Sequence, residues 1–199
     1  MLHNNRLRPA VRNILLTLAL LLVFLIVAIP FKVMSVIPGF TDIRPVSLLQ
    51  PVFGIFFGIP GCIAFAIGNL IGDIISDSLK WSSIAGFVAN FAGPFLFYLF
   101  LCRLSKTPFS LRTGKGLLKH SAVTVLSAVT QTVLITPFVK LFYPEISAWI
   151  FAASVMLNDS VFPIMLGIPL MILMQEELGF KPKASLSEQS GSAAVHQPD

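Results

Sequence analysis

Long apolar runs make up most of the chain, and proline, glycine and charged residues divide them. The runs predict six helices, at residues 13–31, 46–59, 61–79, 81–102, 117–142 and 147–175. Because a helix that crosses a membrane needs about 20 apolar residues, we predict an all-α, polytopic membrane bundle of six transmembrane helices. The second helix would extend only about 21 Å at 1.5 Å per residue. It is therefore either tilted, extended into the preceding loop, or a partial span.

The lysine and arginine residues predict which helix ends face the cytoplasm. With the N-terminus inside, most of the 14 basic residues fall in inner segments, namely Arg6, Arg8, Arg12, Arg103, Lys106, Arg112, Lys115, Lys119, Lys181 and Lys183. The predicted outer segments carry Lys32, Arg44, Lys80 and Lys140. Positively charged loops are retained in the cytoplasm. We therefore expect six spans rather than five, with both termini cytoplasmic.

The chain divides into a basic cytoplasmic N-terminus at 1–12, a six-helix membrane domain at 13–175 and a tail at 176–199. The tail is rich in Ser, Gln, Ala and charge and lacks apolar periodicity, so we predict a disordered cytoplasmic tail. The beginning of the chain resembles a signal peptide, but no small-residue cleavage site follows at 28–31. We expect an uncleaved first helix and a multi-pass protein of the cell membrane.

The composition supports a lipid environment. Hydrophobic residues make up 55% of the sequence and charged residues 12%, against about 25% charged in an average soluble domain. The net charge of +5 comes from residues that flank apolar runs, which argues against a nucleic-acid partner. Cys62 and Cys102 stand singly, so we expect no metal site. No Walker A, H-E-x-x-H or G-x-S-x-G motif is present, and we predict no catalytic residues, no cofactor and no enzyme activity.

Acidic residues inside the third predicted helix are the first candidates for a binding site. Asn69, Asp73 and Asp77 are spaced four apart and so share one helical face. An acid costs roughly 2.5–3.5 kcal/mol at the bilayer centre, which favours a functional role. The alternative is structural: Asp77 is a solvated helix end beside Lys80, and Asp73 pairs within the protein.

Polar residues of the later helices are predicted at comparable depth, namely Asn90, Gln131, Thr136, Asn158 and Asp159. Taken singly, an Asn or Gln here is equally an interhelical hydrogen bond or a ligand contact. Taken together, these residues predict one water-filled cavity in the outer half of the bundle. Arg44 lies in the outer loop before the second helix. It either neutralises a carboxylate or phosphate of a ligand or pairs with Asp42 or a lipid headgroup.

Small residues repeat at four-residue spacing on two helices, namely Ala64, Gly68, Gly72 and Ser76, and Ala85, Ala89 and Gly93. Such ridges let helix backbones approach closely. We interpret them mainly as internal packing surfaces, although the same spacing suits the docking of a partner membrane protein.

Three motifs lie in the stretch 40–77: IRP at 43–45, FGIFFGIPG at 53–61 and GNLIGD at 68–73. With the six-helix plan and the inner N-terminus, this stretch resembles the substrate-binding S components of energy-coupling factor (ECF) transporters. The motifs cover less than a quarter of the chain. The family's A-x-x-x-A motif on the first helix has no counterpart here, where Thr17, Ala19 and Ala28 lack that spacing.

The resemblance implies a membrane-embedded receptor that captures a vitamin or similar micronutrient from outside. Its implied partners are a small polar ligand, a transmembrane T component and two ABC ATPases in the lipid bilayer. The implied pocket lies between the loop after the first helix and the outer halves of helices four to six. The expected substrate-binding residues are Arg44, Asn69, Asp73, Asp77, Asn90, Gln131, Asn158 and Asp159. The identity of the ligand stays open.

Two other functions remain in competition. The spacing of Asn69, Asp73 and Asp77 is similar to the Mg²⁺-binding acids of intramembrane prenyltransferases, and Mg²⁺ does favour carboxylates with a substrate phosphate. That family has a second acid-rich motif, for which Asn158 and Asp159 are the remaining candidates here. The third possibility is a membrane scaffold subunit that binds no ligand and uses its buried acids structurally.

Overall fold

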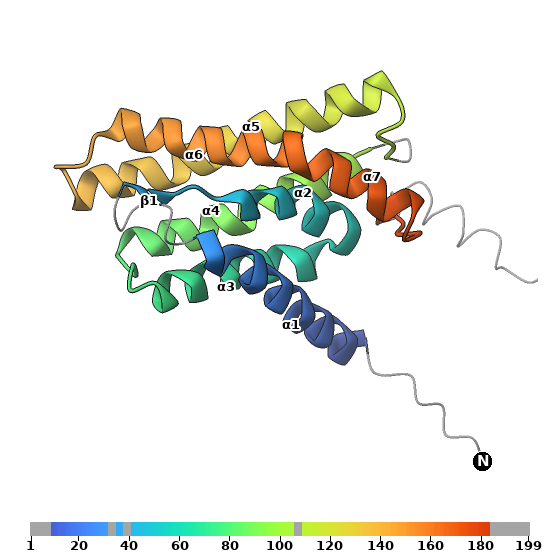
Figure 1. The fold of residues 1–199 in the computed structure, drawn as a ribbon, viewed down its shortest axis with the longest axis horizontal. Coiled ribbons are helices and arrows are strands. Elements are labelled where there is room, and N and C mark those ends of the chain that lie inside the picture. Colours follow the sequence, from blue (N-terminus) through green and yellow to red (C-terminus); the bar gives the residue numbers. More distant parts are fainter. Residues whose placement is uncertain (1–8, 32–34, 38–40, 106–108, 184–199) are drawn as a thin grey trace, which may run out of the picture.

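The computed structural model describes residues 9–31, 35–37, 41–105 and 109–183, which form a bundle of helices with two short strands (Figure 1). Helix α1 (Pro9–Ala28) continues into the 3-10 turn η1 (Ile29–Phe31). Strands β1 (Ser35–Ile37) and β2 (Thr41–Asp42) then form an antiparallel pair. Residues 1–8, most of the predicted outer loop before Thr41, and the tail beyond Lys183 lie outside the described chain.

The second predicted helix is a chain of three short pieces. These are the 3-10 turn η2 (Pro45–Leu48), helix α2 (Leu49–Val52) and the π-helical turn η3 (Phe53–Phe57). Gly58 follows with a φ of 64°, a backbone conformation that glycine adopts without a steric penalty. This corner turns the chain directly into α3 (Ile59–Ile75).

The remaining helices are longer, and π-helical turns extend two of them. Helix α4 (Ser82–Phe97) continues through η4 (Tyr98–Arg103), and α5 (Gly114–Phe142) follows. Helix α6 (Ala148–Phe162) continues through η5 (Pro163–Gly167) into α7 (Ile168–Glu176). Thr113 caps α5, where its side chain accepts a hydrogen bond of 3.1 Å from the backbone N–H of Gly116.

Four helical segments are long and apolar enough to cross a membrane: Pro9–Phe31, Ser82–Arg103, Gly114–Phe142 and Ala148–Glu176. The two others, Pro45–Phe57 and Ile59–Ile75, are apolar but shorter. Each of the six predicted helices therefore has a counterpart. The third ends at Ile75 rather than at the predicted residue 79.

Aromatic side chains fill much of the apolar core of the bundle. Phe24, Phe53, Phe65 and Phe97 are each at most 1% exposed. The rings of Phe24 and Phe65 meet edge to face at 4.8 Å between centroids. A side chain at Gly68 would overlap the ring of Phe24, so this glycine lets α1 cross α3 closely.

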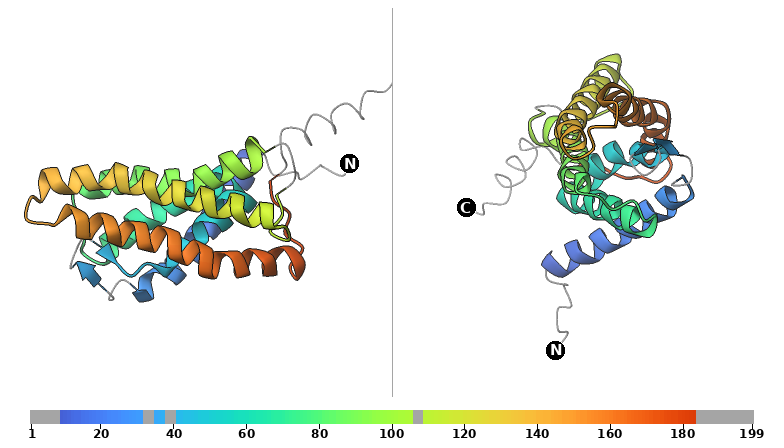
Figure 2. Two further views of the ribbon diagram at one scale, coloured as in Figure 1. Left: turned by 90° about the horizontal axis from the view of Figure 1, so that it is seen from above. Right: turned by 90° about the vertical axis from the view of Figure 1, so that its left-hand side faces the viewer.

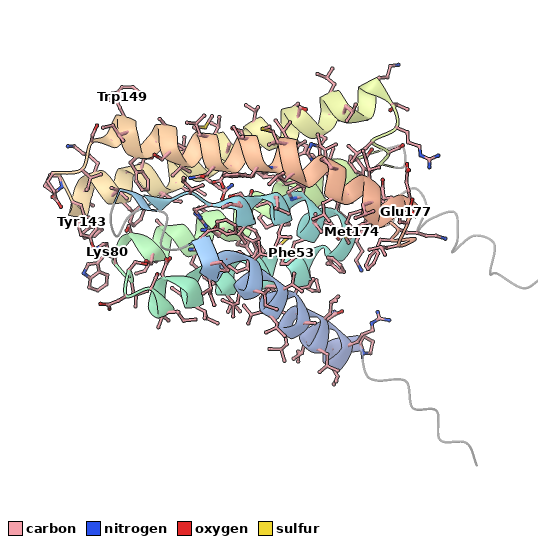
Figure 3. The ribbon with its side chains drawn as sticks, in the orientation of Figure 1. Phe53, Lys80, Tyr143, Trp149, Met174 and Glu177 are labelled. Carbon is pink, nitrogen blue, oxygen red and sulfur yellow. The ribbon has the colours of Figure 1, made fainter. Side chains whose placement is uncertain are left out.

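Labelled side chains mark the two ends of the bundle. Figure 3 shows Lys80, Tyr143 and Trp149 at one end, with Met174 and Glu177 at the other. The turns between α3 and α4 and between α5 and α6 lie at the first end (Figure 1). At the second end, an ion pair of 2.9 Å joins Arg112, before α5, to Glu176 at the end of α7.

The first residues of the predicted tail pack back onto the bundle at this second end. The backbone N–H of Lys183 donates a hydrogen bond of 2.9 Å to the carbonyl of Ile55. The ring of Phe180 lies edge to face against Phe56 and Phe57, at centroid distances of 6.1 and 5.9 Å. This part of the tail therefore helps to cover the π-helical turn η3.

Helix α1 lies at the edge of the bundle and slants away from it (Figure 2). Only Leu20, Phe24 and Ala28, all in its second half, are buried. A groove of about 310 Å³ separates its first half from the beginning of α3. The groove is lined by Asn13, Ile14, Thr17, Leu18, Ile59, Pro60 and Ile63.

Candidate functional site

Buried polar side chains from six helical elements meet inside the apolar bundle. We call them the polar cluster: Ser47, Gln50, Asn69, Asn90, Ser127, Gln131, Asn158 and Asp159. None of them is more than 7% exposed. Because an unpaired buried polar group is costly, the hydrogen bonds among them decide how the cluster is held together.

Arg44 connects the loop after β2 to three helices. Its Nη2 donates hydrogen bonds to Oδ1 of Asn69 at 2.7 Å and to Oδ1 of Asn90 at 3.1 Å. Its backbone N–H donates to Oδ1 of Asn158 at 2.9 Å. The guanidinium is therefore turned into the bundle and contacts side-chain amides. Asp42 was one of the partners predicted for Arg44, but its side chain lies outside the described part of the structure.

Asp159 is 1% exposed and has two very different carboxylate oxygens. Oδ1 accepts hydrogen bonds from Oγ of Ser47 at 2.7 Å and from Nε2 of Gln50 at 2.9 Å. Oδ2 is buried and has no hydrogen-bond partner within the described chain. Buried polar atoms are nearly always paired, so this oxygen is an acceptor with unused capacity.

Gln50 and Gln131 form the centre of the cluster. Nε2 of Gln131 donates to Oε1 of Gln50 at 3.0 Å, and Oγ of Ser127 donates to the same oxygen at 3.3 Å. A Cβ atom at Gly93 would lie 2.7 Å from Oε1 of Gln50 and 2.9 Å from Nε2 of Gln131. The missing side chain of this glycine therefore makes the room in which the two amides meet.

The predicted acidic face of α3 divides into a part inside and a part outside the cluster. Nδ2 of Asn69 donates to Oδ2 of the half-buried Asp73 at 3.4 Å, which places Asp73 at the edge of the cluster. Asp77 lies beyond the last residue of α3, is exposed and has a φ of 51°. The face predicted to include all three residues thus ends before Asp77.

A Schellman turn is the physical reason why Asp77 departs from that face. The backbone N–H of Ser78 donates to the carbonyl of Asp73 at 2.8 Å, and that of Asp77 donates to Ile74 at 3.2 Å. This pair of hydrogen bonds ends a helix with one residue in the left-handed conformation. Asp77 is that residue, so its side chain no longer follows the helical repeat.

The other predicted site residues meet, and three further residues join them. Ser47, Gln50 and Ser127 contact the cluster but were not among the residues predicted from sequence. The sequence indicates both Gln50 and Ser127 in retrospect. Gln50 is a lone amide within an apolar run, and Ser127 stands four residues before Gln131 on the same helical face. Thr136 lies outside the hydrogen-bonded cluster, and its buried Oγ1 has no partner in the described chain.

The cluster is closed in this conformation. A cavity of about 10 Å³ lies beside Arg44 and Asn69, with Phe24, Ala28 and Phe31 among its apolar walls. That is about the space needed for one water molecule. Among the described residues, no three His, Cys, Asp or Glu side chains are grouped as metal ligands would be. The arrangement supplies hydrogen bonds and opposite charges in a dry environment, which suits selective binding.

Comparisons with known proteins do not identify a function for this chain, so the site is the basis for one. The sequence matches no protein-family model and no curated protein. The resemblance to ECF S components therefore depends on the three motifs at 43–45, 53–61 and 68–73 and on the helical plan. Two of these motifs contribute Arg44, Asn69 and Asp73 to the cluster or its edge.

Proposed function

We propose that this chain is the membrane-embedded substrate-binding subunit of an ECF-type importer, which captures a small polar micronutrient from outside the cell. The observation that carries this proposal is the polar cluster, buried in an apolar bundle and held closed by Arg44 from a loop. Polar and charged groups inside a membrane protein are costly and commonly mark ligand pathways. A scaffold would be more stable with apolar side chains at these positions.

The proposed topology has six membrane segments and cytoplasmic termini. One end of the bundle carries Arg103, Arg112, Lys115, Lys119, Lys181 and Lys183. The opposite end carries Lys80 and Lys140 together with Trp81, Tyr143 and Trp149. Basic residues concentrate on the cytoplasmic side of membrane proteins, and aromatic residues at the interfaces. This distribution supports a cytoplasmic position for the end that carries Arg103 and Arg112.

In this topology the polar cluster lies in the outer half of the membrane. Asn158 stands about 15 Å from the outer start of α6, at 1.5 Å per residue. Arg44 then enters from the outer side, directly after β2. A ligand from outside would meet this segment first, and movement of the segment would open the cluster.

Import would require partners, because the chain has no nucleotide-binding motif of its own. We propose that the groove between α1 and α3 receives the transmembrane T component. Helix α1 is apolar over most of its length after Asn13, yet the side chains of its first half lie outside the bundle core. The groove also lies at the proposed inner end, close to the ATPases with which a T component associates.

The test is to purify the full chain from native membranes and identify bound small molecules by native mass spectrometry. We expect a polar molecule to co-purify and to raise the melting temperature when added back. Asn90→Ala should weaken its binding, whereas Thr130→Ala should not, because the Thr130 hydroxyl is exposed and donates only to the carbonyl of Leu126 in its own helix.

Other outcomes would point to the competing functions. A protein that carries no small molecule and is not stabilised by any vitamin, nucleobase or amino acid would be a scaffold subunit. Mg²⁺-dependent turnover of an isoprenoid diphosphate would identify a transferase. Co-purification of a membrane protein with two ABC ATPases would support the importer, provided that disruption of the α1 groove abolishes it.

A further inference from the structure

We infer that the ligand of the polar cluster is a small organic cation that donates an N–H hydrogen bond to Oδ2 of Asp159. This inference rests on the proposed function and names the class of its substrate. Among the described residues, three buried side-chain atoms lack a hydrogen-bond partner: His120 Nε2, Thr136 Oγ1 and Asp159 Oδ2. Only the last belongs to the polar cluster and to an acidic group.

The charges of the cluster favour a cation. In the described part of the chain, the charged residues at the cluster include Asp159 inside, Asp73 at the edge and Arg44 from the loop. Among the described residues, Asp159 is the one acidic side chain buried inside the cluster, at 1% exposure. Charges attract or repel far more strongly in a low-dielectric interior than in water. The Asp159 carboxyl group therefore disfavours a carboxylate or phosphate ligand beside it and favours a cation.

The hydrogen bonds around Asp159 independently favour a cationic ligand. Arg44 donates to the amide oxygens of Asn69 and Asn90 and not to Asp159. The donors that reach Asp159, from Ser47 and Gln50, both bind Oδ1. Oδ2 therefore needs a donor that the described chain does not supply. An N–H group that carries positive charge is the strongest such donor.

The cluster is closed, so entry of a ligand requires a movement of the segment that contains Arg44. The cavity beside Arg44 and Asn69 has room for about one water molecule and is not lined by Asp159, so a ligand reaches Asp159 only if the segment around Arg44 moves. Arg44 donates three hydrogen bonds to side-chain amides. Such bonds exchange partners at little net cost. Withdrawal of Arg44 would also free oxygens of Asn69 and Asn90 as further acceptors for the cation.

The experiment compares three probes of one shape on the full chain in phosphatidylcholine nanodiscs. Benzamidinium is the cation, benzamide the neutral analogue and benzoate the anion; methylguanidinium and methylurea form a smaller pair. We expect the cations alone to raise the melting temperature. Asp159→Asn should weaken benzamidinium binding at least about tenfold, which corresponds to one charged hydrogen bond. Asp77→Asn removes an exposed acid outside the cluster and should change nothing.

Several results would overturn the inference. These are equal stabilisation by benzamide, binding of benzoate, cation binding that survives Asp159→Asn, or no binding of either cation at millimolar concentration. Stabilisation by sodium chloride but not choline chloride would assign the site to a metal ion instead. If Asp159→Asn does not fold, the probe comparison on the unmodified protein still decides. An anionic or neutral co-purified ligand would refute this inference and leave the proposed function intact, whereas no ligand at all would refute both.

Discussion

The aromatic core and the polar cluster share one short segment of the chain but are held together by different forces. Ser47 and Gln50 bind Asp159, while Phe53, three residues after Gln50, lies in the aromatic core at 1% exposure. Rings in a core fill space densely and cannot shift without opening a cavity. Hydrogen-bonded amides can exchange one partner for another. The aromatic core is therefore the rigid part that preserves the bundle, and the polar cluster is the adaptable part that receives a ligand. We call them the rigid half and the adaptable half.

The largest effect should follow removal of a core ring. Phe53→Ala should lower the free energy of unfolding by about 3–5 kcal/mol, because the cavity cannot be refilled. Phe100→Ala is the matched control, since that ring is 40% exposed and its loss leaves no internal cavity. Thermal unfolding in detergent measures both. Equal losses in the two variants would contradict a rigid core at Phe53.

Two glycines test whether the halves differ in adaptability. A Cβ at Gly54 would overlap the carbonyl oxygen of Pro94, which belongs to the backbone and cannot move aside. A Cβ at Gly93 would meet the amide ends of Gln50 and Gln131. We expect Gly54→Ala to cost roughly 1–3 kcal/mol of unfolding free energy and Gly93→Ala less.

Gly114→Ala is the control for both variants, since no atom lies within 4 Å of the position that a Cβ at residue 114 would take. Gly93→Ala should instead impair ligand binding, measured by calorimetry. A larger loss of stability for Gly93→Ala than for Gly54→Ala would reverse the assignment of rigid and adaptable halves.

A double-mutant cycle on Gln50 and Gln131 measures the strength of the cluster itself. We expect Gln50→Leu and Gln131→Leu to be non-additive, since each removes the hydrogen bond from Nε2 of Gln131 to Oε1 of Gln50. The coupling should be about 0.6–1.7 kcal/mol, the range known for hydrogen bonds between membrane helices. Additive losses of unfolding free energy would indicate that the two amides do not depend on each other.

The smallest effect is expected at Asp77, outside both halves. Asp77→Asn should change the free energy of unfolding by less than about 0.5 kcal/mol, because the residue is exposed and asparagine tolerates the left-handed conformation. Ligand binding should also stay unchanged, in contrast to Asn90→Ala. A clear loss of affinity for Asp77→Asn would mean that the site extends to the end of α3.

The apolar runs were sufficient to predict the helices, because a helix in lipid must be apolar over most of its length. Their bounds differ from the prediction chiefly where local hydrogen bonds end or reshape a helix. The Schellman turn after Ile75 shortened the third helix and removed Asp77 from the predicted face. The second helix is a series of 3-10, α and π turns, which no hydrophobic period distinguishes.

The sequence by itself determined that costly polar residues would fall at similar depths in separate helices, since helical rise and the positions of charge set those depths. Only the tertiary structure decided which of them meet. The direction of Arg44 depends on how its loop packs, and the contact of Gln50 with Gln131 depends on the space left by Gly93. The unpartnered oxygen of Asp159 is likewise a property of neighbours that are distant in sequence, because a hydrogen bond requires contact in space.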